Sequence, residues 1–95
     1  MTGTDFDRYA PLDDAGRDLR AGDWVRLVKL PDLTGMPPET HDVFARALGK
    51  TFRIEWFDRH GLAHLDLTKK VARLHSVFVE PFLLHRTRRG GERRP

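Results

Sequence analysis

Four short segments of this chain have the apolar pattern of β-strands, and Gly, Pro or Asp turn signals separate them: residues 24–30, 51–56, 62–68 and 75–80. The clearest is 51–56, where Phe52, Ile54 and Trp56 alternate with Arg53 and Glu55. Side chains on a strand point alternately to opposite faces, so this pattern predicts one buried face and one wet face. Short strands joined by turns favour an antiparallel sheet.

The second and third segments are expected to form a hairpin. Residues 58–61 read Asp-Arg-His-Gly, and Gly61 suits the positive φ that a tight turn requires. Alternation predicts that Phe52 and Trp56 lie in the core, with Trp56 covering one end of the sheet. On the other side of the turn, the inward positions are Ala63, Leu65 and Leu67, and the outward positions are His64 and Asp66.

A loop and a helix are predicted between the first two strands. Pro38 suits the first helical turn, and Gly49 suits the position after the last turn. The expected apolar stripe of the helix is Val43, Phe44, Ala47 and Leu48. After Pro81, residues 82–84 are expected to form a 3₁₀ turn that covers an open end of the sheet.

These elements predict a mainly β fold: a small SH3-like antiparallel barrel with one short helix after the first strand and a 3₁₀ turn near the end. Short, strongly bent strands suit such a barrel because curvature removes exposed sheet edges. The predicted organisation is an irregular N-terminal arm at 1–21, the barrel at 22–84 and a basic disordered tail at 85–95.

A family resemblance supports this fold. The stretch Gly-Asp-Trp-Val-Arg-Leu at 22–27, then Leu-Pro at 30–31 and Gly-Lys-Thr at 49–51, resembles the nitrile hydratase β-subunit and the electron-transport accessory group. The closing Val-Glu-Pro-Phe-Leu at 79–83 resembles the last strand and 3₁₀ turn of such barrels. The resemblance covers residues 22–84 and implies a scaffold and an accessory role. It transfers no catalytic residue, because that chemistry uses a Cys-rich metal site on the other subunit.

Composition narrows the class of protein. The chain has 95 residues, enough for one domain, and no Cys, which excludes disulfides, thiolate metal sites and Cys nucleophiles. Arg outnumbers Lys thirteen to four, and Asn and Gln are absent, a bias typical of GC-rich bacterial genomes. An acidic, polar N-terminus unlike a signal peptide and the lack of disulfides favour the cytoplasm. No apolar run approaches the roughly 20 residues that span a membrane.

The formal net charge of +3 is unevenly distributed. Residues 1–22 hold five Asp and three Arg, residues 23–84 hold nine basic and eight acidic groups, and residues 85–95 hold five Arg and one Glu. The basic character therefore belongs to the tail, and the predicted barrel is nearly neutral.

The favoured function is a non-catalytic protein-binding module or an accessory subunit of a bacterial enzyme complex, without cofactors. The 31–48 insertion is long for so small a barrel, and long ordered loops are usually functional. A homo-oligomer is left open. The predicted partner-binding residues are Trp24, Met36, His41, Phe44 and Phe57.

Nucleic-acid binding is the main alternative. The basic linker before the last strand and the Arg-rich tail would supply phosphate contacts. The residues assigned to that role are Lys69, Lys70, Arg73, Arg86, Arg88 and Arg89. A further alternative is an accessory protein of the nitrile hydratase type.

Catalytic and metal roles are the weakest hypotheses. His64 and Asp66 share a strand face, and His75 would join them if its strand pairs alongside, which makes a two-His-one-carboxylate set. A solvated strand face is the simpler interpretation. Ser76, the one serine, lacks a nucleophile motif, and its neighbour His75 points to the opposite face. No catalytic residue is predicted.

Overall fold

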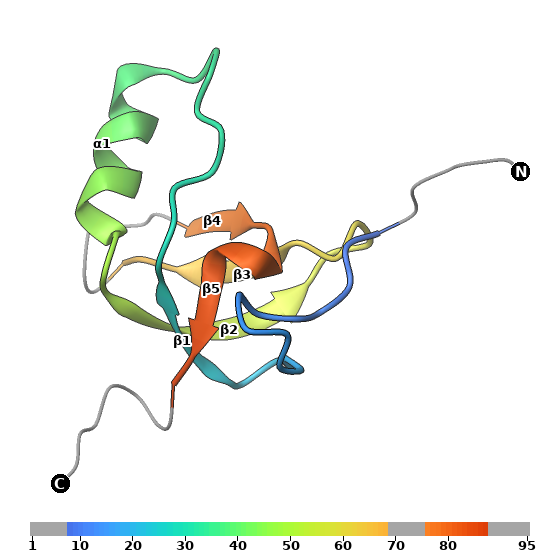
Figure 1. Cartoon of the computed structure of the whole chain (residues 1–95). Helices are drawn as coiled ribbons and strands as arrows, with labels where there is room; N and C mark the ends of the chain where they lie inside the picture. The colour runs from blue at the N-terminus through green and yellow to red at the C-terminus, as the bar shows by residue number, and fades with distance from the viewer. Residues whose placement is uncertain (1–7, 69–75, 88–95) are drawn as a thin grey trace, which may run out of the picture.

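The computed structural model describes residues 8–68 and 76–87 of the chain (Figure 1). In chain order the elements are β1 (Trp24–Leu27), α1 (Pro38–Ala47), β2 (Thr51–Phe57), β3 (Ala63–Asp66), β4 (Ser76–Val79), the 3₁₀ helix η1 (Pro81–Leu83) and β5 (Leu84–Arg86). This confirms the mainly β fold, the helix after the first strand and the 3₁₀ turn near the end.

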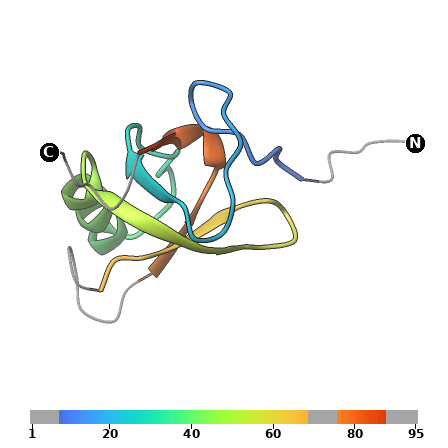
Figure 2. The same cartoon turned by 90° about the horizontal axis from the view of Figure 1, so that it is seen from below.

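The strands form one antiparallel sheet in the order β4-β3-β2-β1-β5. Strand β2 links two halves of it: residues 51–53 pair with β1, and residues 54–57 pair with β3. Within the described ranges, β4 and β5 are the two edges, so the sheet is not closed into the barrel that the sequence suggested. Figures 1 and 2 show α1 at one end of the sheet and the β2–β3 turn at the other.

The core lies where the inner faces of the strands meet α1 and the N-terminal segment. Each helix and strand contributes buried apolar residues to it, including Leu83 of η1, and two partly buried side chains, Leu33 and Phe57, pack against it. The fully buried large side chains include Leu27, Ile54, Leu65, Leu67 and Leu84. Alternation correctly predicted which residues of β3 face this core.

Helix α1 forms where the sequence predicts it, and its end is attached to β1. Pro37 is the N-cap and Pro38 the first residue, where the missing amide hydrogen costs no helical hydrogen bond. At the other end, Gly49 adopts a φ of 85° and its N–H donates to the Leu27 carbonyl over 2.8 Å. Of the expected stripe, Leu48 is exposed because it is the C-cap, with an extended ψ of 130° that turns it off the helix face.

A β-bulge reverses the predicted orientation of Trp56. The pairing of β2 with β3 shifts register between Ile54 and Trp56, so one extra residue is accommodated there. Both Glu55 and Trp56 are consequently exposed, and Phe57 packs against the core in the place expected for Trp56. The prediction that Trp56 is a core residue is therefore wrong, while Phe52 is buried as expected.

The N-terminal segment from residue 8 is part of the packed fold. Leu19 belongs to the core, and an isolated bridge pairs Leu12 with Asp18. The Tyr9 N–H donates to the His60 carbonyl of the β2–β3 turn over 2.8 Å, and the Tyr9 ring meets Phe82 edge-on.

Strand β5 extends past the boundary predicted after residue 84. His85 and Arg86 pair with Arg26 and Val25 of β1, and the Thr87 N–H donates to the Trp24 carbonyl. Residues 85–87, which the sequence assigned to the tail, are thus bonded to β1.

Candidate functional site

Three aromatic side chains form a row across the outer face of the sheet, one from each of β2, β3 and β4. Trp56 is the register partner of His64, and His64 is the register partner of Phe78. The Trp56 and His64 rings are stacked, with centroids 5.0 Å apart and planes at 18°. Phe78 meets both rings edge-on, at 5.3 Å from Trp56 and 4.9 Å from His64. These three residues are called the aromatic row below.

The aromatic row is open to solvent. Trp56 is 48% exposed and Phe78 is 43% exposed, while His64 between them is half-buried. The Nδ1 atom of His64 is buried, and among the described residues it has no hydrogen-bond partner. Large rings gathered on a surface mark an interaction site more often than large rings scattered singly. The row is therefore the candidate functional site.

Charged side chains border the aromatic row. Glu55 is the extra residue at the bulge, and both it and the adjacent Trp56 are exposed. Asp66 shares the outward side of β3 with His64, and its Oδ1 accepts the Thr68 N–H over 2.9 Å. Arg53 is also exposed, two residues before Glu55, and its register partner is Trp24 of β1. Among the described residues, the charged groups nearest the row along β2 and β3 are thus Glu55 and Asp66.

The structure does not gather the five predicted partner-binding residues on one surface. Phe44 is 3% exposed and packs in the core, and Phe57 is half-buried against it. Both are therefore unsuited to contact a partner in this conformation. Met36 is exposed, and Trp24 is half-buried. The His41 Nε2 lies 3.0 Å from the Leu33 carbonyl oxygen, which ties the start of α1 to its preceding loop.

Of the residues assigned to nucleic-acid contact, only Arg86 lies in the described part of the chain. It is a residue of β5, and its guanidinium donates to the Asp18 carbonyl over 3.0 Å. This places Arg86 in the attachment of the N-terminal segment. The other predicted contacts lie outside the described residues: Lys69, Lys70, Arg73, Arg88 and Arg89.

The predicted His64, Asp66 and His75 metal set cannot be assembled from the described residues, because His75 lies outside them. His64 and Asp66 do share the outer face, but the imidazole is stacked in the aromatic row. A different group, Asp13, Asp14 and His85, brings three potential ligand atoms within 4.8 Å of one another. The Arg17 guanidinium is bonded to both Asp13 and His85, so a cation already occupies that cluster.

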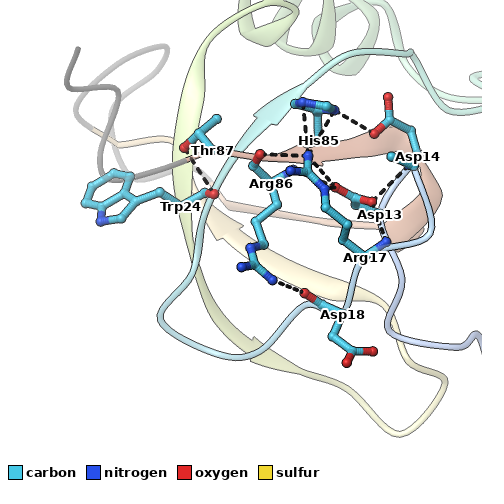
Figure 3. A network of polar contacts seen from close by, with 9 residues as sticks. Asp13, Asp14, Arg17, Asp18, Trp24, His85, Arg86 and Thr87 are labelled. Atoms are coloured by element: carbon cyan, nitrogen blue, oxygen red, sulfur yellow. Dashed lines mark hydrogen bonds and ion pairs between the residues drawn. The ribbon is translucent and has the colours of Figure 1, made fainter. Parts of the chain in front are cut away.

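Asp13 is the centre of a polar network that joins the N-terminal segment to β5 (Figure 3). Its residue exposure is 4%, although the sequence suggested an exposed arm. Oδ1 accepts the N–H groups of Ala15 and Arg17, each at 2.9 Å. Oδ2 accepts the Arg86 N–H at 2.9 Å and the Arg17 side chain.

These contacts lower the pKa of the Asp13 carboxyl from 3.8 to about 2. Burial by itself would raise the pKa, because it disfavours the charged form. The backbone N–H groups of Arg86, Arg17 and Ala15, together with the Arg17 charge, outweigh that effect by stabilising the carboxylate. The ionised form of Asp13 therefore holds this part of the fold together.

The same network includes His85. Nη2 of Arg17 lies 3.5 Å from Nδ1 and 3.1 Å from Nε2 of His85, so the guanidinium lies against the imidazole ring. His85 Nδ1 is 2.8 Å from Asp14 Oδ1. The side chains of Asp14, His85, Arg17 and Asp13 therefore form one continuous set of polar contacts between the N-terminal segment and β5 (Figure 3).

Sequence reasoning missed the aromatic row because it followed strict alternation through β2. A signal was present: the adjacent pair Trp56 and Phe57 cannot both take the core face of a regular strand. Which ring takes the core depends on the bulge, and the bulge is a property of pairing with β3.

Comparison with known proteins identifies no relative. No protein-family model matches the chain, and no curated protein and no solved structure shows a significant similarity to it. Among the described residues, no helix has the length and apolar character needed to cross a membrane. The function must be argued from the aromatic row itself.

Proposed function

We propose that this chain is a non-catalytic module that binds another protein through the aromatic row. One observation carries the proposal: Trp56 and Phe78, two large rings near half exposure, are held edge-on at 5.3 Å on the outer face of the sheet. Aromatic side chains are enriched in protein interfaces, where they contribute a large contact area for little loss of side-chain entropy.

The row is held rigidly, which favours binding. Each of its rings comes from a paired strand, and the two outer rings each contact the central His64. A surface that is ordered before binding loses less conformational entropy when a partner docks. The row runs across three neighbouring strands, which suits an extended segment of a partner.

The proposal extends to the fold type and the cellular role. The strand order β4-β3-β2-β1-β5, with η1 between β4 and β5, supports an SH3-like arrangement of the strands. It agrees with the resemblance to barrels of the nitrile hydratase β-subunit type. An accessory subunit that docks on a bacterial enzyme would use the aromatic row as its contact.

Nucleic-acid binding remains the competing function, since exposed rings also stack on unpaired bases. The charges of the described residues support a protein partner over a nucleic acid. Glu55 and Asp66 lie on the outer face around the row, and a carboxylate beside Trp56 repels a phosphodiester backbone. The described residues therefore favour a protein partner.

Selection from a displayed peptide library tests the proposal. Peptides selected on the wild-type protein are expected to lose at least about tenfold in affinity for Trp56→Ala or Phe78→Ala, since buried aromatic contacts dominate interface energies. Phe82→Ala is the matched control, because Phe82 is equally exposed but its ring lies against Tyr9. Its effect is expected to stay within about twofold.

Two results would contradict the proposal. One is a set of selected peptides whose affinity is unchanged by Trp56→Ala and Phe78→Ala. The other is binding of single-stranded RNA that depends on Trp56 in the absence of any peptide binding. Far-ultraviolet circular dichroism of each variant confirms that the fold is retained.

A further inference from the structure

We infer that the aromatic row selects an arginine side chain on its protein partner, with the guanidinium stacked on Trp56 and paired with the Glu55 carboxylate. This inference rests on the proposed function and names the chemistry that the row recognises. It follows from the bulge in β2, which brings a large exposed ring and an acidic group to one position.

The bulge is the first step of the argument. In a regular strand, consecutive residues point to opposite faces, so Glu55 and Trp56 would be separated by the sheet. The register shift between Ile54 and Trp56 leaves both residues exposed. A carboxylate therefore stands beside an indole on a rigid strand, where both can contact the same ligand group.

The availability of Glu55 is the second step. Among the described residues, the Glu55 side chain makes no hydrogen bond or ion pair, whereas Asp13 and Asp14 are both engaged by basic side chains. Trp56 is stacked on His64 and meets Phe78 edge-on, and 48% of it remains exposed. Within the described part of the chain, an acceptor and part of an indole surface are thus open to a ligand.

The charged residues around the aromatic row indicate that the ligand group is positively charged. The charged residues closest in the strands to the aromatic row are Glu55 and Asp66, and Glu80 follows Phe78 at the next outward position of the β4 segment. Arg53 is the one basic residue of β2, and its register partner is Trp24 of β1. A cation is attracted to this border, and an aromatic face attracts a cation as well.

Geometry favours arginine over lysine. The guanidinium is planar and weakly hydrated, so it stacks on an indole while its N–H groups pair with a carboxylate in the same plane. The lysine ammonium is compact and strongly hydrated, so it gains less from the ring. The part of the Trp56 indole that His64 and Phe78 leave exposed is a planar surface on which a planar group can stack.

NMR titration with short peptides tests the inference. The probes are N-acetyl-Gly-Arg-Gly-amide and its citrulline counterpart, which keeps the planar shape and loses the charge. The arginine peptide is expected to shift the Trp56 indole N–H signal saturably and to bind at least about threefold more tightly than the citrulline peptide. Glu55→Gln is expected to lower the affinity for the arginine peptide to that for the citrulline peptide. Glu39→Gln in α1 is the matched control, for which no change in affinity is expected.

Equal binding of the two peptides, or an unchanged preference in Glu55→Gln, would overturn the inference. Two further probes, a proline-rich peptide and an aromatic peptide, test the proposed protein-binding function independently of the arginine preference. If those peptides shift the Trp56 signal and the arginine peptide does not, the arginine preference is wrong and the protein-binding function stands. If only an oligouridylate shifts it, both are wrong.

Discussion

Replacing Gly61 by alanine is expected to destabilise the fold by about 3 kcal/mol, because two costs fall on one residue. Gly61 has a φ of 83°, a conformation that costs an L-residue roughly 1–2 kcal/mol. In addition, a Cβ at this position would overlap the backbone carbonyl and nitrogen of Tyr9, and backbone atoms cannot move aside as a flexible side chain does. Urea denaturation measures the loss, which corresponds to a fall in melting temperature of roughly 15 °C.

Gly35→Ala is the control for the steric part of this effect. Gly35 has nearly the same φ, 82°, and a Cβ there would meet nothing within 4 Å. Its cost is expected to be the conformational part alone, about 1 kcal/mol. Hydrogen exchange adds a specific readout, since Gly61→Ala should expose the Tyr9 N–H that donates to His60. Equal losses of unfolding free energy in the two variants would mean that the N-terminal segment does not pack closely against Gly61 in the β2–β3 turn.

Replacing Asp13 by asparagine is expected to cost about 3 kcal/mol at neutral pH. Both carboxylate oxygens accept N–H groups: those of Ala15 and Arg17 on one oxygen, and that of Arg86 on the other. An amide has only one acceptor oxygen, so either orientation turns an NH₂ group toward a buried N–H donor. The loss is measured as the change in the free energy of unfolding in urea.

The contribution of Asp13 is expected to disappear in acid. Its pKa is lowered in the folded state to about 2 from 3.8, so the carboxylate stabilises the fold fully above about pH 4. That stability is lost as the pH falls from about 4 through 2, because the folded state must then take up a proton at a site arranged for a carboxylate. The difference in stability between wild type and Asp13→Asn should therefore narrow steadily over this range.

Asp14→Asn separates this effect from the general loss of an acidic residue. The Asp14 side chain is partly exposed, and within the described network it contacts only His85, so its replacement should cost less than about 1 kcal/mol. If Asp13→Asn costs no more than Asp14→Asn, or if its deficit is independent of pH, the buried carboxylate does not hold the N-terminal segment to β5.

The local features of the fold could be predicted from residues alone. Alternation identified the inner face of β3, proline and glycine marked the ends of α1, and Gly49 and Gly61 take the positive φ that their positions suggested. These features depend on neighbours in the sequence. The candidate site could not be predicted in the same way, since Trp56 was assigned to the core.

The role of Asp13 was also beyond local reasoning. Its partner Arg86 is 73 residues away in the sequence, and nothing near Asp13 in the chain indicates a buried carboxylate. Charge counting placed Asp13 in an acidic exposed arm and Arg86 in a basic tail. The two residues meet because β5 pairs with β1, beside which the N-terminal segment lies.

Sequence by itself determined the class of fold, the positions of the strands and the helix, and the absence of cysteine chemistry, because these depend on residue type and on patterns within a few residues. Only the tertiary structure decided which of two adjacent rings, Trp56 or Phe57, packs against the core and which is exposed to solvent. The physical reason is the bulge: one extra residue in β2, accommodated against β3, inverts the alternation and creates the aromatic row.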